Sequence, residues 1–189
     1  MPGRSPALQA MLDDIEREAR ATGNLTGRPR FSASVMEAMA AVPRERFVPR
    51  SMRAMAYADS ALPLSHGQTI SQPYIVALMT ELLDSAPNDV VLEGGTGSGY
   101  QSAVLARLVR QVYSLEVVSA LADSARERLS ELAVDNVEVI HGDGWQGCAD
   151  HAPYNGILVT AAAPAVPPAL VEQLATGGHL VIPVGQPYG

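Results

Sequence analysis

The sequence of 189 residues lacks the cysteine pairs, the long apolar runs and the signal-peptide core that mark disulfide-bonded, membrane and secreted proteins. Cys148 is its only cysteine, which excludes an internal disulfide and a zinc cluster built on cysteine ligands. No apolar run approaches the roughly 20 residues that a helix needs to span a bilayer. The N-terminal segment turns acidic and lacks the apolar core of a signal peptide. We therefore expect a cytoplasmic protein with no membrane partner, and we identify no metal ligands.

Basic residues are also scarce, since 13 Lys and Arg stand against 20 Asp and Glu, for a net charge of -7. Surfaces that bind nucleic-acid phosphates usually carry an excess of Lys and Arg, so we expect no nucleic-acid partner. Aromatic residues make up 5% and hydrophobic residues 47%, which predicts a mainly aliphatic core. This composition favours an ordered domain of ordinary size over a disordered chain.

Apolar residues spaced by three and four predict a helix over residues 6–21, followed by a loop over residues 23–30. Ser32 or Ser34 can cap a second short helix, which should end before Pro43. Both helices belong to an N-terminal part of the chain that precedes the alternating pattern described below.

Residues 44–71 show little periodicity but hold several apolar side chains, so we expect a long structured connector of the kind that often carries function. Arg44, Arg46 and Arg50 could hold an acidic peptide, although such a set is more often a solvated face. A helical pattern resumes at residue 73. We expect a single domain over residues 1–189, with a substrate-side segment at 1–72 and an α/β core at 73–189.

Five short apolar runs alternate with helical patterns after Pro87. The runs are Val90–Leu92, Val112–Leu115, Val137–Ile140, Ile157–Val159 and Leu180–Val184. The helical patterns cover about 100–110, 118–132 and 166–176. Strands that alternate with helices imply βαβ units with right-handed crossovers, and so predict an α/β fold with a doubly wound, mostly parallel sheet.

A glycine-rich segment, Val91–Tyr100, follows the first predicted strand of this sheet. Glycine permits a sharp turn and a close approach of ligand to backbone, and ligands of such folds bind at the carboxyl ends of the strands. Glu116 ends the second strand, where it could accept hydrogen bonds from two ribose hydroxyls. Asp143 lies in the segment 141–144 after the third, where it could accept one from an adenine amino group. The simpler interpretation is a glycine turn beside two solvated acids.

The ligand of such a site could be a dinucleotide or another adenosine derivative. The glycines follow the spacing G-x-G-x-G at Gly95, Gly97 and Gly99, whereas dinucleotide sites follow G-x-G-x-x-G. Glu93 precedes them and suits a cationic ligand, because its carboxylate would repel a pyrophosphate. We therefore favour an adenosyl ligand that carries a positive charge.

Several segments in order resemble the protein-L-isoaspartate O-methyltransferase family over residues 34–186. The most specific is Gly67–Tyr74, which reads GQTISQPY. The others are Leu92–Tyr100, His141–Trp145, Thr160–Ala163 and Leu180–Gly185. The resemblance implies a Rossmann-like enzyme that transfers a methyl group from S-adenosyl-L-methionine to the free carboxyl group of L-isoaspartyl residues in damaged proteins, leaving S-adenosyl-L-homocysteine.

The resemblance also assigns residues to roles. Ser71 matches the family's active-site serine, and Thr69, Ile70 and Ser71 would contact the substrate. Cofactor contacts would come from Glu93, Gly95, Thr96, Gly97, Ser98, Gly99, Glu116, Gly142, Asp143 and Gly144. Ser71 could instead act only as a helix N-cap ahead of Pro73.

Three departures from the family pattern stand out. Gly94 replaces a common Ile or Val, and Asn155-Gly156 replaces a common Asp-Ala, which removes an acid near the site. The chain stops at Gly189, so we expect C-terminal strands to be missing and the fifth strand to present an edge that could pair with another subunit. These departures leave room for a relative that methylates aspartate in a dedicated peptide and for a non-catalytic binding module. A dinucleotide oxidoreductase is a more distant alternative.

The proposed chemistry agrees with the side chains present. A carboxylate nucleophile is ionised at neutral pH, so methyl transfer needs no strong general base. No Ser-His-Asp or Cys-His set stands out in the sequence. Trp145 can line the adenine pocket or fill the core, and the run Arg126-Glu127-Arg128 is interpreted as helix surface.

Overall fold

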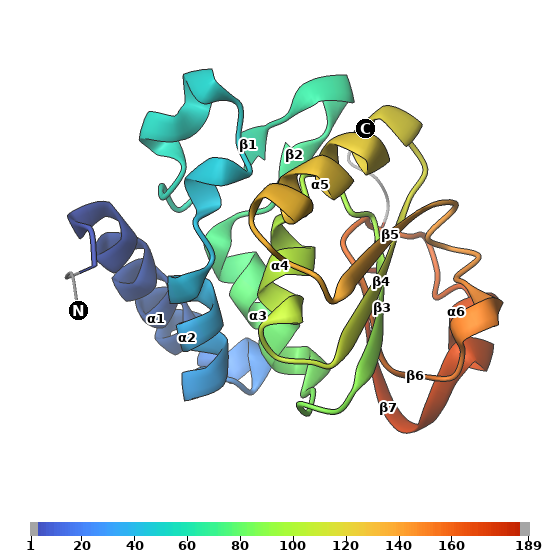
Figure 1. Cartoon of the computed structure of the whole chain (residues 1–189). Helices are drawn as coiled ribbons and strands as arrows, with labels where there is room; N and C mark the ends of the chain where they lie inside the picture. The colour runs from blue at the N-terminus through green and yellow to red at the C-terminus, as the bar shows by residue number, and fades with distance from the viewer. Residues whose placement is uncertain (1–3, 186–189) are drawn as a thin grey trace. The chain divides into compact units, whose positions relative to one another are not determined.

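The computed structural model describes residues 4–185 and divides the chain into two compact units, Met1–Glu81 and Leu82–Gly189 (Figure 1). The boundary falls inside helix α3 (Pro73–Leu83), several residues after the division expected at residue 72. The expectation of a single domain stays a prediction.

The first unit begins with helix α1 (Pro6–Thr26), which is longer than expected. The sequence prediction of a loop from Gly23 was wrong, because the helix ends only where Gly27 adopts the left-handed conformation (φ 70°) and donates its N–H to the carbonyl of Gly23. The hydroxyls of Thr22 and Thr26 satisfy carbonyls one turn back, at 2.8 and 3.2 Å. The polar composition of this last turn concealed its helical geometry.

Helix α2 (Ala33–Ala41) is capped by Ser32, whose hydroxyl accepts the N–H of Val35, and it ends before Pro43 as expected. Ser32 also donates from its N–H and its hydroxyl to the Glu81 carboxylate at 2.8 and 2.9 Å. Phe31 stacks on Tyr74 with ring centroids 6.0 Å apart. These contacts join the start of α2 to α3 within the first unit.

The connector between α2 and α3 is ordered, as expected. It holds three short 3-10 helices and a two-stranded antiparallel ladder, in which Leu62 pairs with Ile70. Strands of two residues are too short for a periodic signal, so the sequence did not predict them. The elements are η1 (Arg44–Arg46), η2 (Arg50–Met55), β1 (Leu62–Pro63), η3 (Ser65–Gly67) and β2 (Thr69–Ile70).

The second unit is built on a five-stranded parallel sheet in the order β5-β4-β3-β6-β7, which confirms the predicted fold class. The strands are β3 (Val90–Gly94), β4 (Gln111–Glu116), β5 (Val137–His141), β6 (Tyr154–Val159) and β7 (Leu174–Val181). The helices are α4 (Tyr100–Ala106), α5 (Ser119–Glu131) and α6 (Pro168–Gln173), with a 3-10 turn at η4 (Ala149–His151). In Figure 1, α4 and α5 lie on one side of the sheet and α6 lies on the other.

The core of this unit is mainly aliphatic, as the composition predicts. Its fully buried side chains include Val91, Leu92, Val112, Leu115, Ile157, Leu158 and Leu170, with Tyr154 and Tyr100 as aromatic members. The strands β3 and β6 are almost continuous apolar runs because helices cover both faces of the sheet.

The last predicted elements were misplaced along the chain. The helix expected over 166–176 ends at Gln173, and the strand expected from Leu180 begins already at Leu174. Between the pairs Tyr154–Leu174 and Gly156–His179 the register shifts, and Gly177 has a φ of 81° in the extra segment. Such a bulge breaks the alternation on which a strand prediction rests. Within the described residues β7 is an edge strand, and Gly189 lies outside them.

Candidate active site

The strand order creates a topological switch point between β3 and β6. From β3 the chain winds outward through β4 to β5, whereas β6 pairs with the opposite edge of β3 and is followed by β7. Gly94 and Val159 end these two strands side by side. Because the flanking connections leave in opposite directions, a crevice for ligands is expected at this carboxyl edge.

The glycine-rich loop after β3 needs glycine for two separate reasons. Gly95, Gly97 and Gly99 all have positive φ, at 91°, 53° and 88°. A Cβ on Gly95 would also lie 2.4 Å from the Thr160 hydroxyl oxygen. Thr160, which follows β6, lies within hydrogen-bond distance of the carbonyls of Gly94 and Gly95, with its hydroxyl 3.2 and 2.9 Å from them. The loop is therefore anchored to the neighbouring strand end.

Other anchors hold the same loop from β4 and α5. The N–H groups of Gly95 and Thr96 donate to the carbonyl of Leu115 at 2.8 and 3.1 Å. Arg128 is half-buried and donates to the carbonyl of Ser98 at 2.7 Å, a role that its assignment to the helix surface did not predict. Burial lowers the pKa of the Arg128 guanidinium from its ordinary value.

Glu116 ends β4, as the sequence predicted, and its carboxylate lies against the glycine loop. One oxygen accepts the N–H of Gly97 at 2.8 Å and the other accepts the N–H of Val118 at 3.0 Å. The residue is 5% exposed. Each carboxylate oxygen can accept more than one hydrogen bond, so both retain capacity for hydroxyl donors.

The segment after β5 packs directly on the end of β3. Gly142 donates to the carbonyl of Glu116 at 3.0 Å. A Cβ on Gly144 would lie 2.9 Å from the Cα of Gly94, and one on Gly94 would lie 3.3 Å from the carbonyl oxygen of Gly144. Glycine at both positions therefore allows the two backbones to approach each other closely.

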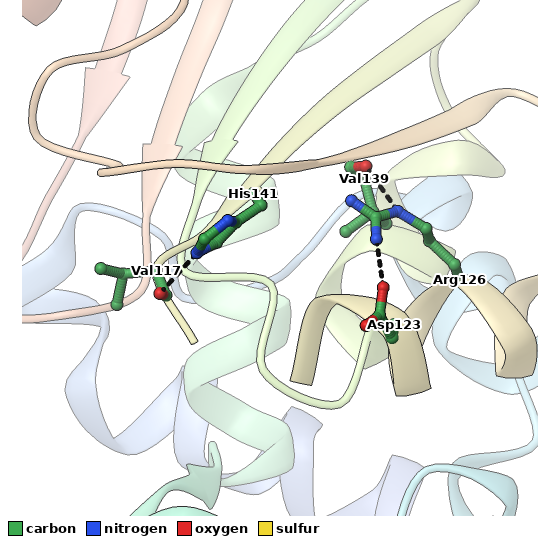
Figure 2. A network of polar contacts seen from close by, with 5 residues as sticks. All are labelled: Val117, Asp123, Arg126, Val139 and His141. Atoms are coloured by element: carbon green, nitrogen blue, oxygen red, sulfur yellow. Dashed lines mark hydrogen bonds and ion pairs between the residues drawn. The ribbon is translucent and has the colours of Figure 1, made fainter. Parts of the chain in front are cut away.

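The loops that carry Glu116 and Asp143 are joined by His141, whose Nε2 donates to the carbonyl of Val117 at 3.0 Å (Figure 2). Asp143 itself is exposed, and its carboxylate accepts the N–H of Trp145 at 2.9 Å. Trp145 is 39% exposed, so the alternative that it fills the core was wrong. Figure 2 also shows Arg126 reaching from α5 to the carbonyl of Val139 on the edge strand β5.

Glu93 lies beneath the loop with no exposed surface. One oxygen of its carboxyl group accepts hydrogen bonds from Ser102 of α4 and from Ser114 of β4, the latter at 2.7 Å. Its other oxygen, Oε1, has no hydrogen-bond partner. Burial raises the pKa of Glu93 from 4.5 to about 7, with a smaller upward contribution from the negative Glu116, while the two serine hydroxyls act in the opposite direction.

The substrate-side residues named from the sequence, Thr69, Ile70 and Ser71, belong to the first unit. Thr69 is exposed and Ile70 is buried, so Ile70 can offer a ligand only its backbone. Ser71 is half-buried, its carbonyl accepts a hydrogen bond from Arg44, and its hydroxyl makes none within the described residues. The residue is therefore not the side-chain cap of α3 in this structure.

Sequence reasoning gave no role to Ser102, Ser114, Thr160 or Arg128 in holding the site. Hydroxyl residues in apolar elements give no periodic signal, and only their pairing in three dimensions shows what they bind. Asn155 was misjudged: it lies at the amino end of β6, where its side chain accepts the N–H of Val90 at 2.9 Å. The carboxyl end of β6, at Val159, is four residues further along the strand, or about 13 Å at 3.3 Å per residue. The replacement of Asp by Asn at position 155 therefore does not remove an acid from the site. Residues 4–185 contain no group of three or more His, Cys, Asp or Glu side chains placed to hold a metal ion.

Known proteins match this chain in sequence and in fold. The chain is 54% identical over 178 residues to protein-L-isoaspartate O-methyltransferase 2 of Syntrophobacter fumaroxidans, covering 94% of the chain and 72% of that relative. A protein-L-isoaspartate O-methyltransferase structure matches with a TM-score of 0.76 and 28% identity, over 92% of this chain and 55% of that one. A Plasmodium falciparum structure, described as such an enzyme in complex with S-adenosyl-L-homocysteine, also matches with a TM-score of 0.76, at 26% identity over 95% of this chain and 84% of that one.

The parallel sheet, its switch point and its glycine loop define a Rossmann-like methyltransferase fold. The family model for protein-L-isoaspartate(D-aspartate) O-methyltransferase matches residues 25–189. The chain belongs to this family, and it is therefore an S-adenosylmethionine-dependent enzyme that methylates isoaspartyl residues.

Replacement of Glu93 by Gln should change how stability depends on pH. Because the folded-state pKa of Glu93 is raised from 4.5 to about 7, folding takes up a proton between these values, and the wild type loses stability as pH rises through this window. The loss is about 3 kcal/mol. Glu93→Gln removes this loss, so in urea unfolding the stability of the variant relative to the wild type should rise between about pH 4.5 and about pH 7. Glu138→Gln on the exposed side of β5 is the control, and parallel pH profiles for the wild type and Glu93→Gln would contradict the assignment.

Proposed function

We propose that this chain acts in protein repair: the loop at the carboxyl edge of the sheet binds S-adenosyl-L-methionine, and Ser71 receives the free carboxylate of an L-isoaspartyl residue. The observation that carries the proposal is the unpartnered oxygen of Glu93, fully buried beneath a loop of three positive-φ glycines. A buried carboxyl oxygen without a hydrogen-bond partner is unfavourable, and a cationic ligand group nearby would compensate it.

The residues present fit an adenosyl cofactor. We assign its positively charged amino-acid part to the neighbourhood of Glu93 and to the backbone of Gly95, Thr96, Gly97, Ser98 and Gly99. We assign its ribose hydroxyls to Glu116, which has acceptor capacity left, and its adenine to Asp143 with Gly142 and Gly144. When bound, the cofactor supplies a methyl group on a positively charged sulfur.

The substrate side needs alignment more than activation. A carboxylate with an ordinary pKa near 4 is already a nucleophile at neutral pH. A serine hydroxyl can donate a hydrogen bond to one carboxylate oxygen without adding a competing charge. The free hydroxyl of Ser71 supports this role, and the backbone of Thr69 and Ile70 can add contacts. Well-oriented reactants can gain about 7–11 kcal/mol at best, so alignment is a sufficient catalytic role.

We place the protein in the cytoplasm, in contact with damaged proteins or peptides and not with nucleic acid. The acidic net charge and the single cysteine support this location and these partners. No helix within residues 4–185 is both long and apolar enough to cross a membrane.

The direct test of the function uses two peptides of one sequence, one with L-isoaspartate and one with L-aspartate at the same position. With a methyl-labelled cofactor, we expect label in the isoaspartyl peptide only, released by base as expected for a methyl ester. Label mainly in the aspartyl peptide would favour a peptide-specific aspartate methyltransferase. Binding of S-adenosyl-L-homocysteine in a calorimeter, without label in either peptide, would instead favour a non-catalytic module.

Replacement of Ser71 by Ala should impair transfer more than cofactor binding. Loss of one aligned donor to a charged group costs about 1.5–3 kcal/mol, or roughly tenfold to a hundredfold in kcat/KM for the peptide. The affinity for S-adenosyl-L-homocysteine, measured by calorimetry, should stay unchanged. Ser65→Ala in η3 is the matched control, since this serine is exposed. Equal loss of transfer and of binding would remove Ser71 from the substrate side.

Replacement of Glu116 by Ala should weaken cofactor binding. The variant loses the proposed acceptor for two hydroxyls and also the acceptor of the Gly97 and Val118 N–H groups. We expect the dissociation constant of S-adenosyl-L-homocysteine to rise by about a hundredfold. Glu138→Ala on β5 serves as control, because Glu138 is exposed and distant in sequence from the loop. An unchanged dissociation constant would exclude Glu116 from the ribose site.

A further inference from the structure

Arg44 is the largest fully buried side chain among residues 4–185, although the sequence suggested a solvated basic face. Arg44 lies in η1. Arg46 of the same short helix and the nearby Arg50 are exposed, as expected for a solvated face. The guanidinium of Arg44 donates from Nε to the carbonyl of Ala56 and from a terminal nitrogen to the carbonyl of Ser71, both at 2.7 Å. A charged donor at this distance makes a strong hydrogen bond, roughly twice as strong as a neutral one.

The second of these bonds holds the peptide group that follows Ser71. The carbonyl of Ser71 belongs to the peptide plane between Ser71 and Gln72, so holding its oxygen restricts the backbone rotation that aims the Ser71 side chain. Gln72 is held from the same region of the connector, since its side-chain amide donates to Asp59 at 3.0 Å. Two consecutive residues between β2 and α3 are thus tied to the segment around Ala56–Asp59.

The shape of the guanidinium matters for this arrangement. Its donors form a rigid planar fork, so one side chain can reach two carbonyls at a set angle. A lysine ammonium carries the same charge but lacks the fork, and it cannot reproduce both directions from one point. Lysine at position 44 would therefore keep the positive charge but lose the donor geometry that holds both carbonyls.

We propose that Arg44 is a positioning residue for Ser71: by holding the carbonyl oxygen of Ser71, it orients the hydroxyl that receives the substrate carboxylate. This inference rests on the proposed role of Ser71. Arg44 does not itself contact the reacting atoms in this account, and it acts only through the backbone of Ser71.

The test is a double-mutant cycle on the full chain with Arg44→Lys, Ser71→Ala and the double variant. Initial rates against the isoaspartyl peptide at saturating cofactor give kcat/KM, and calorimetry gives the dissociation constant of S-adenosyl-L-homocysteine. We expect Arg44→Lys to lower kcat/KM by tenfold to a hundredfold, on the order of what a misplacement of about 1 Å costs. In the Ser71→Ala background the same change should lower it by no more than about twofold, with cofactor affinity unchanged.

Arg46→Lys, in the same 3-10 helix but exposed, is the matched control and should leave the rate unchanged. Arg44→Gln keeps an amide donor without the charge, and we expect the same dependence on Ser71 from it. Equal effects of Arg44→Lys in both backgrounds, a parallel loss of cofactor affinity, or failure of both Arg44 variants to fold in circular dichroism would overturn the proposal. Full activity of Ser71→Ala would instead refute the proposed role of Ser71, so the two failures are distinguishable.

Discussion

The second unit depends on how closely its backbone segments approach one another at the carboxyl edge of the sheet. Gly95 has no space for a Cβ beside Thr160, and Gly144 has none beside Gly94. These contacts bring the loops after β3, β5 and β6 close together. Thr160 and Arg128 hold carbonyl groups of the loop, while Leu115 and Glu116 accept hydrogen bonds from its N–H groups, so the loop backbone is fixed from both sides.

The buried carboxyl groups at the carboxyl ends of the strands suit ligand binding, although they lower the stability of the free protein. Glu93 and Glu116 are both buried carboxyl groups of one sign, and Glu93 leaves one oxygen without a partner. Burial raises the pKa of Glu93 to about 7, so the free protein disfavours the charged form of this residue, and a cationic ligand group nearby would favour it. The hydroxyls of Ser102 and Ser114 limit the cost by hydrogen bonding to the other oxygen of Glu93.

The family assignment and the alternation of strands and helices were predictable because they rest on local patterns. Short apolar runs located β3, β4 and β5 closely, and Ser32 located the start of α2. The errors lie where the local pattern is broken: the polar last turn of α1, and the bulge around Gly177 that shifts β7. Both misjudged segments depend on backbone geometry that a periodic signal does not contain.

The sequence by itself determined the fold class, the glycine loop and the two acids at strand ends, because spacing along the chain encodes turn geometry and strand alternation. Only the tertiary structure decided which polar groups are buried and what they bind. Arg44 and Arg128 looked like surface cations, yet both donate to backbone carbonyls far away in sequence. Burial is a property of the packed chain, and the free energy of a charge depends on its surroundings rather than on its neighbours in the sequence.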